Sequence, residues 1–287
     1  MKIDQAYGEQ KRYKAIEVLG EGGFGVVYLA LDTKLSRRVA IKVTKRRLSK
    51  EVSQRFKREA TVTPRLRHPN IVKIFDMDVL EGSGYLVMEY FEDADLEKTL
   101  KKRKFSIQES LFVVAQLASA LSYLEENSII HRDIKPANII VRTNDLHTTL
   151  MDFGLVLSDE STVVTKTGRL IGTPHYLAPE LWLGSPFSSA SDIYALGLVL
   201  HQLLVGEFVF ASCNFVPYQT IAPPLPSLYN SKVTPELDAF VTWCTDADSE
   251  SRCQNGSQFL ERLSQTCVEG RYVVERIQPC TRHVNTQ

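Results

Sequence analysis

The sequence predicts an α+β fold in two lobes: a small antiparallel β-sheet with one helix, followed by a larger, mainly helical lobe. Runs rich in β-branched and apolar residues, separated by turn residues, fill roughly the first third of the chain. After Glu92-Asp93-Ala94-Asp95 the pattern changes to long stretches with apolar residues at helical spacing. We therefore expect an N-terminal lobe over residues 1–91, a C-terminal lobe over 92–270 and a tail of unknown order over 271–287.

The first lobe is predicted to consist of strands around a single helix. Residues 13–43 are typical of a strand, a glycine turn and two further strands. A helix is expected from Glu51 to about Thr63, with Ser49 as its N-cap, because Pro64 and the β-branched residues before it weaken a helix there. Two more strands, Ile71 to Phe75 and Tyr85 to Tyr90, complete this lobe.

The second lobe is predicted around two long helices. These run from Ile107 to Glu126 and from Ser191 to Val205. A loop-rich stretch lies between them, and positioned functional residues tend to lie on such loops.

Composition and charge exclude several classes of protein. Lys+Arg and Asp+Glu both number 34, so no overall charge favours nucleic acid or a membrane surface. Residues 33–67 hold 13 Lys or Arg against only Glu51 and Glu59, and this run is interpreted as solvated faces. No oligomeric state is indicated.

The cysteines and the apolar segments predict a soluble, cytoplasmic protein. The five cysteines are scattered without metal-ligand spacing, which is typical of a reduced compartment. The N-terminus is too polar for a signal peptide. The most apolar stretch, Ile193 to Ala211, is interrupted by His201, Gln202 and Glu207, so it suits a buried helix better than a membrane span.

Three short motifs in the middle of the chain carry the chemistry. They are, in order, His131-Arg132-Asp133-Ile134-Lys135-Pro136-Ala137-Asn138, Asp152-Phe153-Gly154 and Ala178-Pro179-Glu180. Asp133 can orient an attacking hydroxyl or accept its proton, while Asn138 and Asp152 offer the hard oxygen ligands that Mg²⁺ prefers. The alternative, a satisfied surface loop, requires several identities and their order to agree by chance.

A glycine-rich segment precedes these motifs, Gly20-Glu21-Gly22-Gly23-Phe24-Gly25-Val26-Val27. A turn without Cβ atoms lets backbone N–H groups approach phosphates closely. Alone, the three glycines Gly20, Gly22 and Gly25 would equally fit a hairpin turn or a dinucleotide-binding fingerprint. The segment after them is typical of a strand, whereas the dinucleotide fold needs a helix there. Lys42 further along the chain, in Val39-Ala40-Ile41-Lys42, favours a phosphate-binding turn over a plain hairpin.

Together these motifs resemble the signature set of protein kinases over roughly residues 13 to 265. The resemblance implies a two-lobed protein-kinase-like fold, ATP and Mg²⁺ as cofactors, and a protein substrate. The form Lys135-Pro136-Ala137-Asn138 is similar to serine/threonine kinases rather than tyrosine kinases. The resemblance thus implies transfer of the γ-phosphoryl group to serine or threonine hydroxyls.

The resemblance also implies roles for single residues. Asp133 would be the catalytic base, Lys135 the charge partner of the transferred phosphate, and Asn138 and Asp152 the metal ligands. Lys42 would pair with the phosphates and with Glu59. Without that context Lys42 is an ordinary strand-end lysine, and Glu59 belongs to a charged helix face.

The nucleotide pocket is carried over in the same way. Its implied residues are Leu19, Gly20, Gly22, Gly25, Val27, Ala40, Lys42, Met88, Glu89, Phe91, Asp95 and Ile140. Val27 and Ala40 would lie above the adenine, Ile140 below it and Met88 behind it. The backbone of Glu89 and Phe91 would meet the purine edge and Asp95 would face the ribose. The alternative is that the apolar members are ordinary core residues.

Scaffold and regulatory positions follow from the resemblance as well. Glu180 and Arg252 would form a structural ion pair, and Asp192 would brace the catalytic loop. Arg169 occupies the position of the activating phosphothreonine in many kinases. Thr165 and Thr167 lie just before it and are the candidate phosphosites, similar to bacterial kinases of eukaryotic type; otherwise they are solvated loop residues.

Two other functions remain as alternatives. A pseudokinase, a nucleotide-binding scaffold without turnover, would be expected to lack the equivalent of Lys42, Asp133 or Asp152, and all three are present. A small-molecule phosphotransferase with a related core would not need the segment Gly172-Thr173-Pro174 to Glu180, which builds a peptide-docking platform in protein kinases. Substrate, upstream signal and source organism are not indicated by the sequence.

Overall fold

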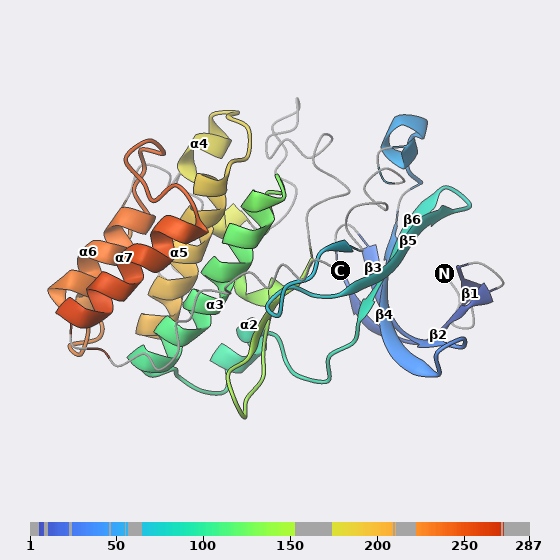
Figure 1. The fold of residues 1–287 in the computed structure, drawn as a ribbon, viewed down its shortest axis with the longest axis horizontal. Coiled ribbons are helices and arrows are strands. Elements are labelled where there is room, and N and C mark those ends of the chain that lie inside the picture. The colour runs from blue at the N-terminus through green and yellow to red at the C-terminus, as the bar shows by residue number, and fades with distance from the viewer. Residues whose placement is uncertain are drawn as a thin grey trace, which may run out of the picture.

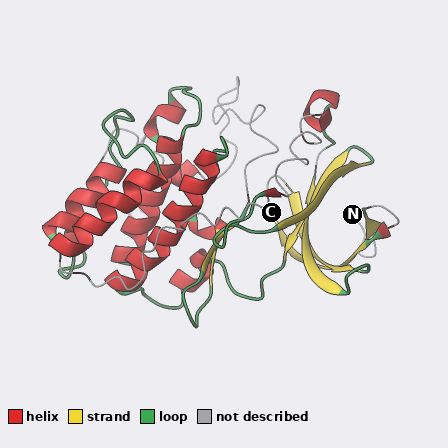
Figure 2. Ribbon diagram, viewed as in Figure 1, coloured by secondary structure: helices red, strands yellow, loops and turns green. Residues whose placement is uncertain are grey.

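The computed structural model describes residues 6–8, 11–22, 25–45, 47–54, 56, 65–152, 174–208, 210, 222–270 and 272. A curved β-sheet forms one end of the molecule and a bundle of helices forms the other (Figures 1 and 2). This arrangement confirms the predicted α+β fold with a sheet-containing part and a mainly helical part.

The sheet is antiparallel throughout, with strand order β1-β2-β3-β4-β6-β5. Its strands are β1 (Ala6–Tyr7), β2 (Tyr13–Glu21), β3 (Gly25–Asp32), β4 (Arg37–Thr44), β5 (Ile74–Leu80) and β6 (Ser83–Glu89). The glycine-rich segment is the turn between β2 and β3, and Lys42 lies on the inner strand β4. The predicted strands around these residues are confirmed.

The strand predicted at Ile71 to Phe75 was wrong in its bounds, since β5 runs from Ile74 to Leu80. Ile71 and Val72 are buried, but they contact the other lobe: Ile71 bridges Leu150, and the N–H of Val72 donates to the Leu150 carbonyl at 3.0 Å. Their apolar character therefore reflects burial between the lobes and not a place in the sheet.

The outer strand β5 carries two aspartates that resemble turn residues in the sequence. Asp76 and Asp78 instead accept hydrogen bonds from the N–H groups of the residues that follow them, Met77 at 2.9 Å and Val79 at 2.7 Å. Because β5 is an edge strand, these carboxylates occupy backbone donors that would otherwise be open for pairing.

The helix of the first lobe begins where the sequence predicts. Residues 50–54 and 56 are helical, and the Ser49 hydroxyl accepts a hydrogen bond from the N–H of Val52 at 3.3 Å, as an N-cap does. Residues 57–64 lie outside the described part of the chain, and with them Glu59 and the expected end of the helix near Thr63.

The helical part contains both long helices that the sequence predicts. Its helices are α2 (Leu96–Leu100), α3 (Ile107–Glu126), α4 (Pro179–Trp182), α5 (Ser189–Val205), α6 (Pro235–Cys244) and α7 (Gly256–Glu269). Ser106 closes a capping box with Glu109 at the start of α3. Helix α5 begins two residues earlier than expected because Ser188 caps it, and it ends at Gly206, whose φ is 94°.

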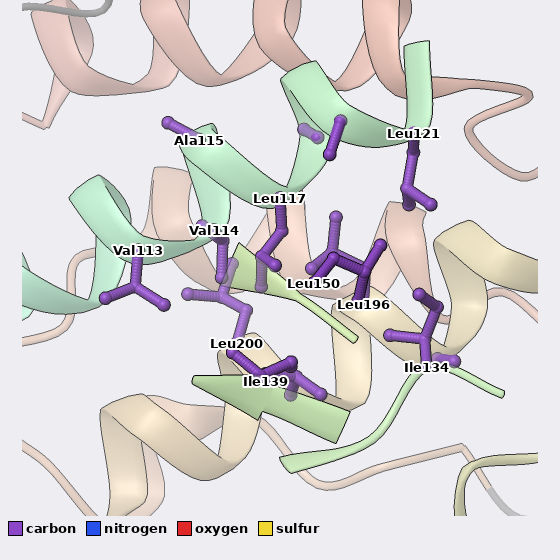
Figure 3. Close-up of a cluster of buried hydrophobic side chains, with 14 of the residues drawn as sticks. Val113, Val114, Ala115, Leu117, Leu121, Ile134, Ile139, Leu150, Leu196 and Leu200 are labelled. Carbon is purple, nitrogen blue, oxygen red and sulfur yellow. The ribbon is translucent and has the colours of Figure 1, made fainter. Parts of the chain in front are cut away.

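Helices α3 and α5 enclose the core that supports the catalytic motifs (Figure 3). Leu117 of α3 and Leu196 of α5 are fully buried, and Ile134 and Ile139, on either side of Asn138, point into the same cluster. Leu150, two residues before Asp152, completes it. Burial of these apolar side chains fixes the backbone on both sides of the polar site.

By length and composition, α3 alone among the described helices could cross a membrane, with a mean hydropathy of 1.2 over its most apolar window. Most of that window is buried inside the molecule. Leu111, Val114, Leu117 and Ala118 are fully enclosed. This pattern fits the core helix that packs between α5 and α7.

Candidate active site

The predicted catalytic loop, residues 131–138, brings three polar side chains together. The Nζ atom of Lys135 lies 2.8 Å from both carboxylate oxygens of Asp133. The side-chain amide of Asn138 donates to the backbone carbonyl of Asp133 at 2.8 Å and to its Oδ2 at 2.7 Å. The loop can fold back in this way because Pro136–Asn138 form a turn of 3₁₀ helix. Asp133 remains accessible, since 44% of its side chain is exposed.

His131 connects this loop with the segment that carries Asp152. Its Nε2 lies 2.7 Å from the carbonyl of Met151, and its Nδ1 accepts a hydrogen bond from the N–H of Asp133 at 3.3 Å. Because a carbonyl only accepts, the proton is on Nε2. Because Nδ1 accepts a hydrogen bond, it carries no proton, and the ring is neutral. Complete burial lowers the pKa of His131, which keeps it neutral. One imidazole thus fixes the backbone beside both aspartates.

Asp192 on α5 supports the same loop, as the resemblance implied. Its carboxylate accepts hydrogen bonds from the N–H groups of His131 at 2.7 Å and Arg132 at 2.8 Å. Burial raises the pKa of Asp192 to about 7, against the opposing effect of these two donors. Arg132 needs this support, because its φ of 72° lies in the left-handed region.

Lys42 and Asp152 form an ion pair across the two lobes. The Nζ atom of Lys42, on β4, lies 3.0 Å from Oδ2 of Asp152. Asp152 follows β8 (Thr148–Leu150) and has a φ of 51°, an unusual backbone for a residue other than glycine. The expected Lys42–Glu59 pair involves a residue outside the described part of the chain. In the structure Lys42 pairs with a predicted metal ligand.

Asn138 and Asp152 fit a divalent cation. Oδ1 of Asp152 is buried and has no hydrogen-bond partner among the residues that the structure describes. Asn138 uses its amide hydrogens on Asp133, so it can offer its oxygen Oδ1 to a ligand. Within the described ranges, no group of three or more His, Cys, Asp or Glu could hold a metal ion by itself. A cation here would therefore share its coordination with phosphate oxygens and water.

The glycine turn has the open backbone that a phosphate requires. The N–H of Gly22 donates to the carbonyl of Gly25 at 2.9 Å and closes the turn. Among the described residues, a Cβ at Gly20 or Gly22 would meet nothing within 4 Å, whereas one at Gly25 would lie 2.5 Å from the carbonyl oxygen of Val43. No described residue therefore covers Gly20 and Gly22 on that side, and Gly25 permits close packing on β4.

Four of the residues expected around the adenine belong to the core cluster that joins the lobes or pack against it. Ala40 and Met88 are 5% and 2% exposed and are direct neighbours across β4 and β6. Val27 and Phe91 pack against the same cluster, and Leu19 is 42% exposed at the end of β2. Glu89 ends β6, and its N–H donates to the Lys73 carbonyl at 2.9 Å.

Asp95 and Ile140 lie side by side, since they form an isolated antiparallel bridge between the start of α2 and β7 (Ile139–Val141). The Asp95 carboxylate caps α2 by accepting the Lys98 N–H at 2.8 Å, and the Lys98 ammonium lies 2.7 Å from it. The residue expected to face a ribose thus also has a structural task.

Two contacts support the segment from Pro174 to Glu180. Arg252 binds both carboxylate oxygens of Glu180, at 2.8 and 2.9 Å, and its side chain is fully buried. The Tyr176 hydroxyl donates to Oε1 of Gln202 on α5 at 2.6 Å. The segment is therefore attached to the helical core at both of these points.

Several predicted residues lie outside the described part of the chain. They are Glu59, Phe153, Gly154, Thr165, Thr167, Arg169, Gly172 and Thr173. The motif does not predict the part that His131 plays. A histidine two residues before the predicted catalytic aspartate is a signal, but the groups that it joins can be identified only from the three-dimensional structure.

Known proteins are similar to this chain along most of its length. A family model described as protein kinase domain matches residues 13–265. A probable serine/threonine-protein kinase of Clostridium acetobutylicum is 35% identical over 270 residues, which cover 91% of this chain and 40% of that protein. Serine/threonine-protein kinase PknB of Mycolicibacterium smegmatis is 37% identical over 265 residues, covering 88% and 42%. The chain thus spans about two fifths of the length of these relatives.

Among solved structures, the PknI kinase domain of Mycobacterium tuberculosis superposes with a TM-score of 0.73 at 24% identity, over 93% of this chain and 99% of that one. At this identity the likeness supports the fold alone.

Proposed function

Because the chain belongs to the protein kinase domain family, we propose that it transfers the γ-phosphoryl group of ATP to serine or threonine hydroxyls of protein substrates, with Mg²⁺ as the cation. The observation that carries the proposal is the link through His131 between two pairs of groups. Asp133 and Lys135 form one pair, and Lys42 and Asp152 form the other.

We assign a separate role in phosphoryl transfer to each of these residues. Asp133, held by Lys135 and Asn138, would accept a hydrogen bond from the incoming hydroxyl and aim its oxygen. Lys135 would place its positive charge beside the phosphoryl group during the transfer. Lys42 would bind the nucleotide phosphates and release Asp152. Asn138 and Asp152 would hold a magnesium ion, whose charge would offset that of the phosphates.

The protein substrate would be held by the segment from Pro174 to Glu180. Its attachment through Tyr176 to Gln202 and through Glu180 to Arg252 gives a fixed surface on the helical lobe. Ala137 carries no carboxylate, so no strong preference for basic substrates is proposed. A cytoplasmic location is also proposed, on the scattered cysteines, and cell fractionation tests it.

Autophosphorylation belongs to the proposal as well. Thr165 and Thr167 lie upstream of Gly172-Thr173-Pro174 in the sequence. Phosphate on either residue would add about −1.5 to −2 charges at neutral pH and could pair with Arg132. The Nε of Arg132 is buried and has no hydrogen-bond partner among the described residues.

Incubation with labelled ATP and Mg²⁺, with and without a generic protein substrate, tests the function. Mass spectrometry should find phosphate on serine or threonine of the substrate, and none with Asp133→Asn. Nucleotide binding without transfer would favour the pseudokinase alternative. Transfer only to small-molecule alcohols would favour the second alternative.

A further inference from the structure

The end of strand β2 that leads into the glycine turn is held by few side-chain contacts. From Ile16 to Glu21 every residue is exposed, and the buried residues of this strand lie at its start. The register of β2 against β3 also shifts twice, the second time between Val18 and Gly20. Burial and regular pairing therefore contribute little to fixing the backbone at this end of the strand.

One ion pair ties this end of β2 to a strand two places away in the sheet. The Nζ atom of Lys45 lies 2.7 Å from Oε1 of Glu21. Glu21 is the last residue of β2 and Lys45 follows the last residue of β4, while β3 lies between these strands. Backbone hydrogen bonds in a sheet join only adjacent strands, so this side-chain contact reaches across β3. The hydrogen bond from Lys45 lowers the pKa of Glu21, so the carboxylate stays ionised at neutral pH.

The ion pair lies on the face of the sheet opposite to Lys42. Glu21 is in register with Val26 of β3, and Val26 is in register with Val43 of β4. Val43 is buried in a cluster of sheet residues separate from the core that joins the lobes, and Val26 packs against it. Directly opposed residues share a face and successive residues alternate, so Glu21 lies on the face of Val43 and not on that of Lys42. Lys45, two residues after Val43, meets Glu21 on this outer face.

Both partners of the ion pair remain in contact with solvent. The exposed fraction is 36% for the side chain of Lys45 and 63% for that of Glu21. Exposed ion pairs contribute little to the stability of the whole fold. At the end of β2, however, few other contacts hold the backbone. Loss of the pair should therefore leave the fold intact and change the position of the neighbouring glycines Gly20 and Gly22.

We propose that Glu21 and Lys45 are positioning residues: their ion pair holds the glycine turn against the sheet so that its backbone is in place for the phosphates of a nucleotide. This inference rests on the proposed function, because it requires that a nucleotide binds at the turn. It gives two charged residues a part in phosphate binding through the backbone between them and not through their own charges.

Binding of a non-hydrolysable ATP analogue with Mg²⁺, measured by isothermal titration calorimetry, tests the inference without relying on turnover. Glu21→Gln and Lys45→Met each remove one charge and keep a side chain of similar length. If the charges acted directly on the phosphates, loss of the carboxylate would strengthen binding and loss of the ammonium would weaken it. If the ion pair positions the turn, both variants should bind the analogue more weakly, by about threefold at low salt.

Three comparisons separate positioning from other effects. The double variant, Glu21→Gln with Lys45→Met, should lose no more affinity than either single variant, because both changes remove the same contact. Adenosine, which carries no phosphate, should bind to all of these proteins with unchanged affinity. The exchange of Glu21→Lys with Lys45→Glu rebuilds the pair with its charges reversed and should recover most of the affinity for the analogue.

Asp145→Asn is the matched control. Nη2 of Arg142 and Oδ2 of Asp145 are also 2.7 Å apart, and the two side chains are 43% and 48% exposed. This ion pair lies in the connection between β7 and β8, away from the glycine turn. Its loss should leave the affinity for the analogue unchanged. At about 1 M salt, where the Debye length is about 3 Å, the original chain should bind the analogue no better than Glu21→Gln does.

Unchanged or stronger binding of the analogue in Glu21→Gln would overturn the inference, as would additive losses in the double variant or an equal loss in Asp145→Asn. Failure of the proposed function looks different. The original chain would then bind the analogue, and the variants could still be compared, but no phosphate would reach a protein substrate. A chain that binds no analogue at all would overturn both.

Discussion

Arg252 and Glu180 are joined by two hydrogen bonds, of 2.8 and 2.9 Å, between the loop before α7 and helix α4. The guanidinium is fully buried and also donates to the carbonyls of Ala190 and Asp246 at 3.0 and 2.8 Å. A buried ion pair affects stability mainly when one partner is removed, because the other charge is then left buried and uncompensated.

Glu180→Ala should therefore lower the free energy of unfolding by about 3 kcal/mol. Urea denaturation measures this effect. Combination with Arg252→Met should cost less than the sum of the single changes, because no lone charge remains. A loss below about 0.5 kcal/mol in Glu180→Ala, as in a surface ion pair, would contradict this view.

Asp133→Asn and Asp152→Asn should damage catalysis far more than folding. Each change keeps the shape of the side chain but removes the charge that orients a hydroxyl or holds a cation, so phosphate transfer should fall by about 10³-fold or more. Calorimetry should show nearly unchanged melting temperatures. Retained transfer in both variants would refute the assignment of these residues.

Lys42→Ala should suppress transfer with a smaller effect on ATP affinity, because the lysine aligns phosphates more than it holds the nucleotide. Steady-state kinetics separates the two effects: kcat should fall more than KM rises. A rise in KM at constant kcat would instead make Lys42 a simple binding residue.

His68 should make the fold sensitive to acid. Its ring stacks on Tyr123 at 5.3 Å and its Nδ1 accepts the Asn70 N–H at 3.1 Å, while burial lowers its pKa to about 4. The unfolded chain, with a histidine pKa near 6.5, binds a proton that the folded chain excludes. The free energy of unfolding should thus fall as the pH drops from about 6.5 toward 4, by about 1 to 2 kcal/mol for this residue.

Urea denaturation at several pH values checks this prediction against His68→Gln, which cannot titrate. Burial also lowers the pKa of His131 and His201, so the variant should keep part of the acid sensitivity. An unchanged difference in stability between pH 7 and pH 4.5 in His68→Gln would show that His68 does not contribute.

Active protein should carry phosphate on Thr165 or Thr167, and the Asp152→Asn variant should carry none. Peptide mass spectrometry of the two proteins gives the comparison. A phosphate there would be paired with Arg132 through charge-assisted hydrogen bonds, and Arg132→Ala should then weaken activation by autophosphorylation. Active enzyme without phosphate on either threonine would mean that both are solvated loop residues.

Much of the fold could be predicted from the sequence, because it rests on local patterns. The apolar spacing predicts α3 with both of its ends, and the β-branched runs predict β3 and β4. The failure at Ile71 has a tertiary cause, since a buried apolar residue looks the same whether it faces its own sheet or Leu150 of the other lobe.

The sequence predicts which residues belong to the candidate site, but not which ion pairs and hydrogen bonds they form. Motif order predicts Lys42, Asp133 and Asp152 as site residues, yet local patterns could not indicate that Lys42 would pair with Asp152. The orientation of His131 toward Met151 likewise depends on a backbone twenty residues away. Which partner each of these side chains binds depends on the groups that surround it in the folded chain.

The aspartates of β5 determine how the sheet can meet other chains. Since Asp76 and Asp78 satisfy the N–H groups of Met77 and Val79 locally, a strand from a second molecule would have to displace two charged groups before it could extend the sheet. The β5 edge of the sheet is thereby protected against β-augmentation, and we expect partners that approach it to be recognised through side chains.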